Sequence, residues 1–198
     1  MLAGAAFIRS RPEILGAISL DLFAVLLGGA VALMPIFARD ILGTGPAGLG
    51  MLRAAPAVGA LATSVWLANR PLRAPVGPRM FAALIAFGLA TVVFALSANL
   101  ALSCLALAVV GAADVVSVVV RSSLVQLRTP DEMRGRVSAV NSLFVGASNQ
   151  LGDFRAGSVA ALLGAVPAAV LGGVGTLIVA ALFMRLFPEL RRLERLEG

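Results

Sequence analysis

The chain has 198 residues, of which 60% are hydrophobic and 13% are charged, whereas charged residues make up ~25% of a typical soluble domain. An aqueous protein of this size could not bury so much apolar surface, so the composition predicts an all-α integral membrane protein with the lipid bilayer as its solvent. One cysteine and no histidine exclude an internal disulfide and a cysteine–histidine metal site, and the sequence contains no catalytic motif. We expect no cofactor, no metal and no enzymatic activity.

Six apolar stretches follow one another along the chain, and each is long enough to cross a bilayer. A hydrocarbon core of ~30 Å takes ~20 helical residues, and lipid offers no partners to backbone groups, so these stretches must be helices. The connections are short, so successive helices are expected to be antiparallel. We predict a single bundle covering 1–198, with transmembrane helices at 13–37, 46–68, 79–98, 100–121, 135–160 and 166–186.

Arginine supplies every basic side chain, because the sequence contains no lysine. Arginines lie before the first predicted helix, between the second and third, between the fourth and fifth, and after the sixth, whereas the other three connections are nearly bare. This positive-inside pattern predicts that both termini are cytoplasmic. The net charge of +6 is therefore a topology signal, and we expect no nucleic-acid partner. The arginines of the basic side are Arg9, Arg11, Arg70, Arg73, Arg79, Arg121, Arg128, Arg134, Arg136, Arg185, Arg191, Arg192 and Arg195.

Two aspartates and two arginines fall well inside the predicted helices. A charge at the middle of a bilayer costs ~2.5–3.5 kcal/mol on insertion scales, so each of these residues is a candidate for function. Asp21 and Asp114 lie in the first and fourth helices, and Arg53 and Arg155 lie in the second and fifth. Such matched positions occur in transporters built from inverted repeats. Because burial favours the neutral form of a carboxylate, Asp21, Asp114 and the nearby Asp153 are the candidates for proton exchange.

The fifth predicted helix carries a stripe of polar and small residues on one face, and Asn149 widens it. On a helix surrounded by lipid, this pattern predicts a wall that faces an aqueous cavity. The alternative is that the polar groups hydrogen-bond between helices and that the buried charges form structural ion pairs. The stripe comprises Arg134, Ser138, Asn141, Val145, Ser148, Gly152 and Arg155.

Several strings resemble the C-terminal half of major facilitator superfamily exporters, in the enterobactin-exporter and macrolide or drug efflux branch. They lie at 19–24, 35–42, 48–56, 129–141 and 146–152, and the resemblance covers essentially the whole chain. It implies a fold of two six-helix halves, in which this chain matches helices seven to twelve. It also implies a secondary transporter, usually a proton-coupled antiporter of a bacterial inner membrane, that exports small molecules such as drugs or siderophores.

These observations predict a substrate and proton path that works by alternating access. Alternating access needs two bundles, so the expected partners are a small-molecule substrate and an N-terminal six-helix half or a second copy of the chain. The alternative is a non-transporting membrane scaffold or a truncated remnant. The superfamily often has a gating motif between the second and third of these helices, but 69–79 lacks its acidic residue. The candidates that line the path are Asp21, Arg53, Asp114, Asn141, Ser148, Asn149 and Arg155.

Overall fold

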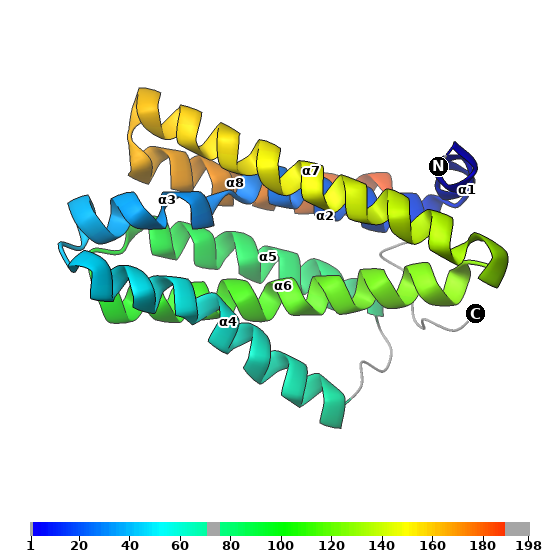
Figure 1. Cartoon of the computed structure of the whole chain (residues 1–198), viewed down its shortest axis with the longest axis horizontal. Coiled ribbons are helices and arrows are strands. Elements are labelled where there is room, and N and C mark those ends of the chain that lie inside the picture. The colour runs from blue at the N-terminus through cyan, green and yellow to red at the C-terminus, as the bar shows by residue number, and fades with distance from the viewer. Residues whose placement is uncertain (1, 71–75, 189–198) are drawn as a thin grey trace.

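A computed structural model describes residues 2–70 and 76–188, and the regular structure in these residues is helical (Figure 1). Arg73 in the predicted gating connection lies outside the described residues, as does the basic tail with Arg191, Arg192 and Arg195. The described elements are α1 (Leu2–Ser10), α2 (Pro12–Gly28), α3 (Ala30–Ile36), the π-helical turn η1 (Phe37–Ile41), α4 (Gly45–Asn69), α5 (Val76–Leu96), α6 (Leu100–Arg128), α7 (Asp131–Leu163) and α8 (Ala165–Leu186).

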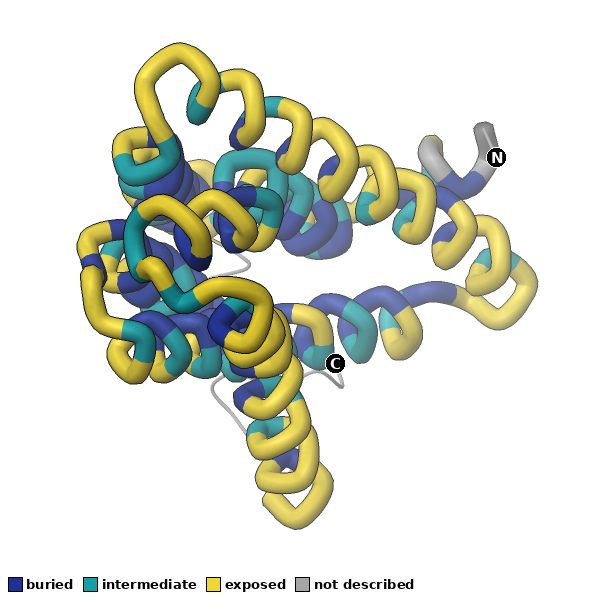
Figure 2. The backbone as a smooth tube through the Cα atoms, turned by 60° about the vertical axis from the view of Figure 1, so that its left-hand side comes forward, coloured by how far each residue is buried: buried dark blue, intermediate teal, exposed yellow. Residues whose placement is uncertain are grey.

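The long helices form two groups that lie side by side (Figures 1 and 2). α2, α7 and α8 pack together on one side, α4 and α5 pack against α6 on the other, and contact between α5 and α8 joins the groups. One apolar cluster draws side chains from both groups, among them Leu20 of α2, Met80 of α5, Leu124 of α6 and Phe183 of α8. This shared core makes the described residues one bundle.

Five helical stretches of the described residues are long and apolar enough to cross a membrane, where we predicted six. They are Pro12–Ile41, which combines α2, α3 and η1, together with α4, α5, α6 and α8. The remaining predicted span, 135–160, forms the middle of α7, an unbroken helix of 33 residues. Its length suffices for a crossing, but the polar stripe makes it less apolar than the others. The prediction of six apolar spans is therefore corrected to five and one long, more polar helix.

The first predicted span, 13–37, is not one continuous helix. α2 ends at Gly28, and Gly29 takes a left-handed conformation with φ +45°, which glycine adopts without steric penalty. α3 then begins at Ala30, and Pro35 near its end has no backbone N–H to donate. The chain continues as the π-helical turn to Ile41, beyond the predicted end of the span. The interruption at Gly29 leaves the last carbonyl groups of α2 without intrahelical donors.

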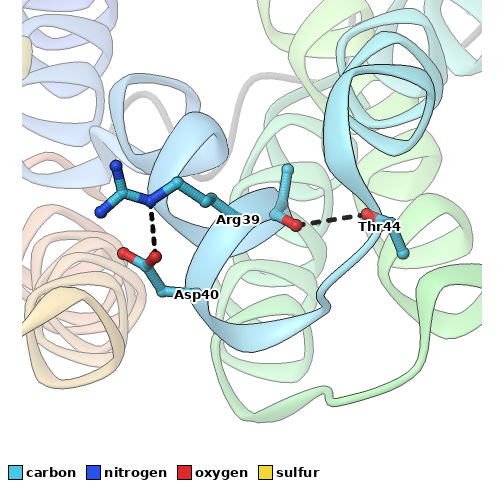
Figure 3. A network of polar contacts seen from close by, with 4 residues as sticks. Arg39, Asp40 and Thr44 are labelled. Atoms are coloured by element: carbon cyan, nitrogen blue, oxygen red, sulfur yellow. Dashed lines mark hydrogen bonds and ion pairs between the residues drawn. The ribbon is translucent and has the colours of Figure 1, made fainter.

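The turn between η1 and α4 is closed by local hydrogen bonds at the sparsely charged end of the bundle. The backbone N–H and the hydroxyl of Thr44 lie 2.9 and 3.4 Å from the Ala38 carbonyl oxygen. Arg39 Nε and Asp40 Oδ1 form an exposed ion pair at 2.7 Å (Figure 3). The two charges offset each other, so this connection remains nearly neutral, as the topology prediction requires.

A short helix precedes the first span, where the sequence predicted none. α1 lies beside the first half of α7, and Ile8 joins a buried cluster with Ile14, Val137 and Val140. Nine residues are too few to give a clear periodic signal. α1 therefore depends on its contacts with α7 and α2 rather than on its own sequence.

Candidate functional site

A buried ion pair links two helices of the bundle. Arg121 Nη1 of α6 lies 3.2 Å from Asp21 Oδ2 of α2, and the two side chains are 5% and 7% exposed. The same nitrogen donates to Asn141 Oδ1 of α7 at 3.0 Å. Asp21, Arg121 and Asn141 therefore form a polar cluster, which connects α2 and α7 of one helix group with α6 of the other.

Arg121 is the residue of this cluster that sequence reasoning assigned to the wrong place. The predicted fourth span ended at Arg121, so the residue was counted with the arginines of the connections. In the structure α6 continues to Arg128, which places Arg121 two turns inside the helix. The sequence does place Arg121 on the same helical arc as Ser103, Asp114 and Ser117, and both of these serines are buried in the structure.

Asp114 lies close to the polar cluster but at the surface. Its residue is exposed, yet it lines a small cavity with Asp21, Ser117 and apolar residues of α2, α5 and α6. The cavity has room for about one water molecule. Two of the three candidate carboxylates therefore border one cavity, with Asp21 on its buried side and Asp114 on its exposed side, whereas Asp153 does not line it.

Arg155 occupies a second polar site at the interruption between α2 and α3. Its Nε donates to the Leu26 carbonyl at 2.9 Å, and its Nη2 donates to the Leu27 carbonyl. These are carbonyl groups that the end of α2 leaves without intrahelical partners, so Arg155 caps the first half of a broken membrane helix. Interrupted helices of this kind line the binding sites of many secondary transporters.

Glycine allows three helices to meet around the Arg155 guanidinium. A Cβ atom added at Gly152 of α7 would lie 2.8 Å from the Val25 carbonyl oxygen, and one at Gly172 of α8 would lie 2.6 Å from the Gly28 carbonyl oxygen. Larger residues at these positions would push α7 and α8 away from α2. The close approach of the backbones therefore brings Arg155 within reach of the α2 carbonyls.

The remaining predicted path residues, Arg53, Ser148 and Asn149, belong to neither of these two polar sites. Ser148 is buried and donates to the Phe144 carbonyl of its own helix at 2.6 Å. Arg53 and Asn149 are exposed, and neither takes part in a side-chain ion pair with another described residue. The predicted stripe on α7 is thus divided, since Ser148 and Gly152 pack inside the bundle while Ser138 is exposed.

Another face of α7 consists of small and polar residues and is not covered by other described helices. A Cβ atom added at Gly135, Gly146 or Gly157 would meet no other described atom within 4 Å. Exposed polar residues lie between these glycines at helical spacing, and Figure 2 shows the outer side of α7 as exposed along its length. Such a face permits close approach by another helix. The polar residues on it are Ser138, Ser142, Asn149 and Asp153.

Apolar helices long enough to cross a membrane, an interrupted first span and buried charges between helices define an all-helical membrane protein. Residues 3–197 match the transmembrane secretion effector family of the major facilitator superfamily, and the chain belongs to this family. It is a family of transporters and not of enzymes. The resemblance that the sequence strings predicted is therefore confirmed.

One relative of known name is the enterobactin exporter EntS of Citrobacter koseri. The two sequences are 31% identical over 97% of this chain and 46% of the relative. The chain thus spans about half the length of the exporter that it matches.

Proposed function

We propose that the chain forms one six-helix half of a proton-coupled antiporter that exports small organic molecules, such as drugs or siderophores, by alternating access. The observation that carries the proposal is the buried Asp21–Arg121–Asn141 cluster between three helices. Protonation of Asp21 would remove the charge that pairs with Arg121 and so weaken the tie between α2 and α6. A proton could then be exchanged for a change in helix packing, which is what coupled transport needs.

The charged surface supports the presence of a second bundle. Arg53 and Asp114 are exposed within membrane-spanning helices, and Asn149 and Asp153 are exposed on α7. A charged side chain facing the bilayer centre costs ~2.5–3.5 kcal/mol, so these residues are more stable against protein or water than against lipid. An N-terminal six-helix half or a second copy of the chain would cover them and complete a central path for the substrate.

The distribution of arginine supports a topology with both termini in the cytoplasm of a bacterium and the bundle in its inner membrane. This topology requires α7 to cross the bilayer despite its polar stripe. A labelling experiment tests the crossing. The single cysteine is removed by Cys104→Ser, one new cysteine is introduced by Ala98→Cys, Leu163→Cys or Glu132→Cys, and a membrane-impermeant maleimide is added from either side. A crossing α7 gives labelling of Ala98→Cys and Leu163→Cys from the same side and of Glu132→Cys from the other. Labelling of Leu163→Cys and Glu132→Cys from one side would contradict it.

Transport is tested in inside-out vesicles that contain the chain, alone and with an N-terminal half of the family. Enterobactin, the molecule in the relative's name, serves as the probe, and an imposed pH gradient drives its accumulation. We expect Asp21→Asn to abolish gradient-driven accumulation, whereas Asp131→Asn, which removes only an exposed pair at the start of α7, retains it. Accumulation that survives Asp21→Asn would reject proton coupling through this residue. If no combination moves the probe or a panel of efflux dyes, the scaffold or remnant is the better account.

A further inference from the structure

A groove opens between α4, α5 and α6 because α4 leaves the bundle beyond its middle (Figures 1 and 2). The crossing of α4 and α6 is fixed by backbone contact. A Cβ atom at Gly59 would lie 1.8 Å from the Ala108 carbonyl oxygen, and one at Gly111 would lie 2.0 Å from the Pro56 carbonyl oxygen. Past this crossing the last turns of α4 diverge from the other two helices. The space between them measures about 850 Å³.

The groove is polar at one end and apolar along its depth. Trp66, Asn69 and Arg70 come from the end of α4, and Arg79 comes from the first turn of α5. Most of the remaining lining is alanine and valine of α5 and α6, and Ala86 lies two helical turns, ~10 Å, from Arg79 along α5. No aspartate or glutamate of the described residues lines the groove. Among the described lining residues, the charged side chains are therefore arginines at one end of the groove.

This arrangement matches the two parts of a membrane lipid. Tryptophan and arginine are characteristic of the membrane interface, and basic pockets between membrane helices bind acidic headgroups. A soluble anion would use the arginines but not the apolar depth. We propose that the groove binds one anionic phospholipid, with its phosphate beside Arg70 and Arg79 and an acyl chain along the alanine- and valine-lined wall. This site lies on the α4–α5–α6 side, apart from the Arg121 and Arg155 clusters, and does not depend on the proposed transport function.

The sequence supplies a reporter inside the groove. Trp66 is the one tryptophan of the 198 residues, there is no tyrosine, and the Trp66 residue is 54% exposed. Bromine on a lipid acyl chain quenches tryptophan fluorescence on contact, so quenching of Trp66 reports a lipid in this groove. The experiment reconstitutes the full chain in phosphatidylcholine nanodiscs and titrates in either dibrominated phosphatidylglycerol or dibrominated phosphatidylcholine.

We expect brominated phosphatidylglycerol to quench Trp66 at a lower mole fraction than brominated phosphatidylcholine. Each arginine near an anionic headgroup favours it about fivefold, so Arg70→Gln should reduce the preference by about that factor. Arg136→Gln is the matched control, because Arg136 is exposed on α7 and outside the groove. Ala112→Phe keeps the arginines and fills the apolar depth, so it should reduce quenching by both lipids.

Four results would overturn the proposal. Equal quenching by the two brominated lipids would show that the groove has no preference for an anionic headgroup. An Arg136→Gln variant that loses as much preference as Arg70→Gln would assign the effect to the general surface potential. Absence of quenching by either lipid would show that protein covers Trp66. Loss of the quenching by brominated phosphatidylglycerol on addition of inorganic phosphate would identify a soluble anion, rather than a lipid, as the preferred occupant.

Discussion

The substitution Arg155→Met tests whether the guanidinium stabilises the interrupted first span. Methionine removes the donors to the Leu26 and Leu27 carbonyl groups and retains an apolar side chain of comparable length. Hydrogen bonds to charged groups contribute ~1.5–3 kcal/mol each in water-soluble proteins, whereas polar contacts between membrane helices reach only ~1.7 kcal/mol. The smaller value applies because groups of separated helices also find partners within a membrane. The average is nearer ~0.6 kcal/mol, so two lost bonds should lower the free energy of unfolding by about 1–3 kcal/mol.

The insertion cost of the arginine does not offset this loss. That cost, ~2.5–3.5 kcal/mol at mid-bilayer, is present both in the folded bundle and in the inserted, unpacked helices, so it cancels from the free energy of packing. Arg155→Lys keeps the positive charge but replaces the planar guanidinium with a single ammonium group. The lysine variant should lose about half as much stability as the methionine variant, because one ammonium reaches the two carbonyl groups less well than the guanidinium does.

The assay is reversible unfolding by sodium dodecyl sulfate in lipid–detergent micelles, followed by far-ultraviolet circular dichroism. Arg53→Met is the matched control, because Arg53 is exposed within α4 and forms no side-chain ion pair with another described residue. We expect the control to change the free energy of unfolding by less than ~0.5 kcal/mol. Equal losses for Arg155→Met and Arg53→Met would refute the capping role of Arg155.

Three further predictions use the same unfolding assay. Asp21→Ala should lower the free energy of unfolding by about 3 kcal/mol, because Arg121 keeps a buried charge without its partner. The double variant Asp21→Ala, Arg121→Met should recover most of this loss. A double variant that does not recover it would contradict the pairing. Gly111→Ala should lower the free energy of unfolding by about 1–3 kcal/mol, because the added methyl group pushes α4 away from α6. Gly50→Ala, on an open surface, should leave the free energy of unfolding unchanged. Similar losses at both glycines would reject the close crossing. Asn99→Ala should cost ~1 kcal/mol, because its Oδ1 accepts two backbone N–H groups at the start of α6, and faster amide exchange confined to that turn would accompany it.

Local patterns predicted the long helices but missed α1 and some of the helix ends. Hydropathy and proline placement put helices close to where the structure has them, because each depends on the residues of one segment. Arg121 shows the limit of this reasoning. A charged residue lowers local hydropathy and marks a span end, yet α6 continues past it since Asp21 and Asn141 provide its polar partners.

The interruption of the first span depends on a residue far away in the sequence. Two adjacent glycines suit either a helix that packs closely or a helix that ends, and the sequence of the span does not choose between them. The deciding contact comes from Arg155, which is 129 residues from Leu26. The sequence singled out Arg155 as a costly charge within the membrane, but its use as a cap required knowing that α7 lies beside α2.

The two polar sites act on one helix, and their separation suggests how the bundle moves. Asp21 and Gly29 are eight residues apart, ~12 Å along α2. At the first position α2 is tied to Arg121 of α6, and at the second it is tied to Arg155 of α7. A proton on Asp21 weakens only the first tie, because the carbonyl groups that bind Arg155 do not titrate. Under the proposed function, protonation therefore loosens α2 from α6 while α2, α7 and α8 stay together, and the Arg121–Asn141 hydrogen bond and the α5–α8 contact continue to join the two helix groups.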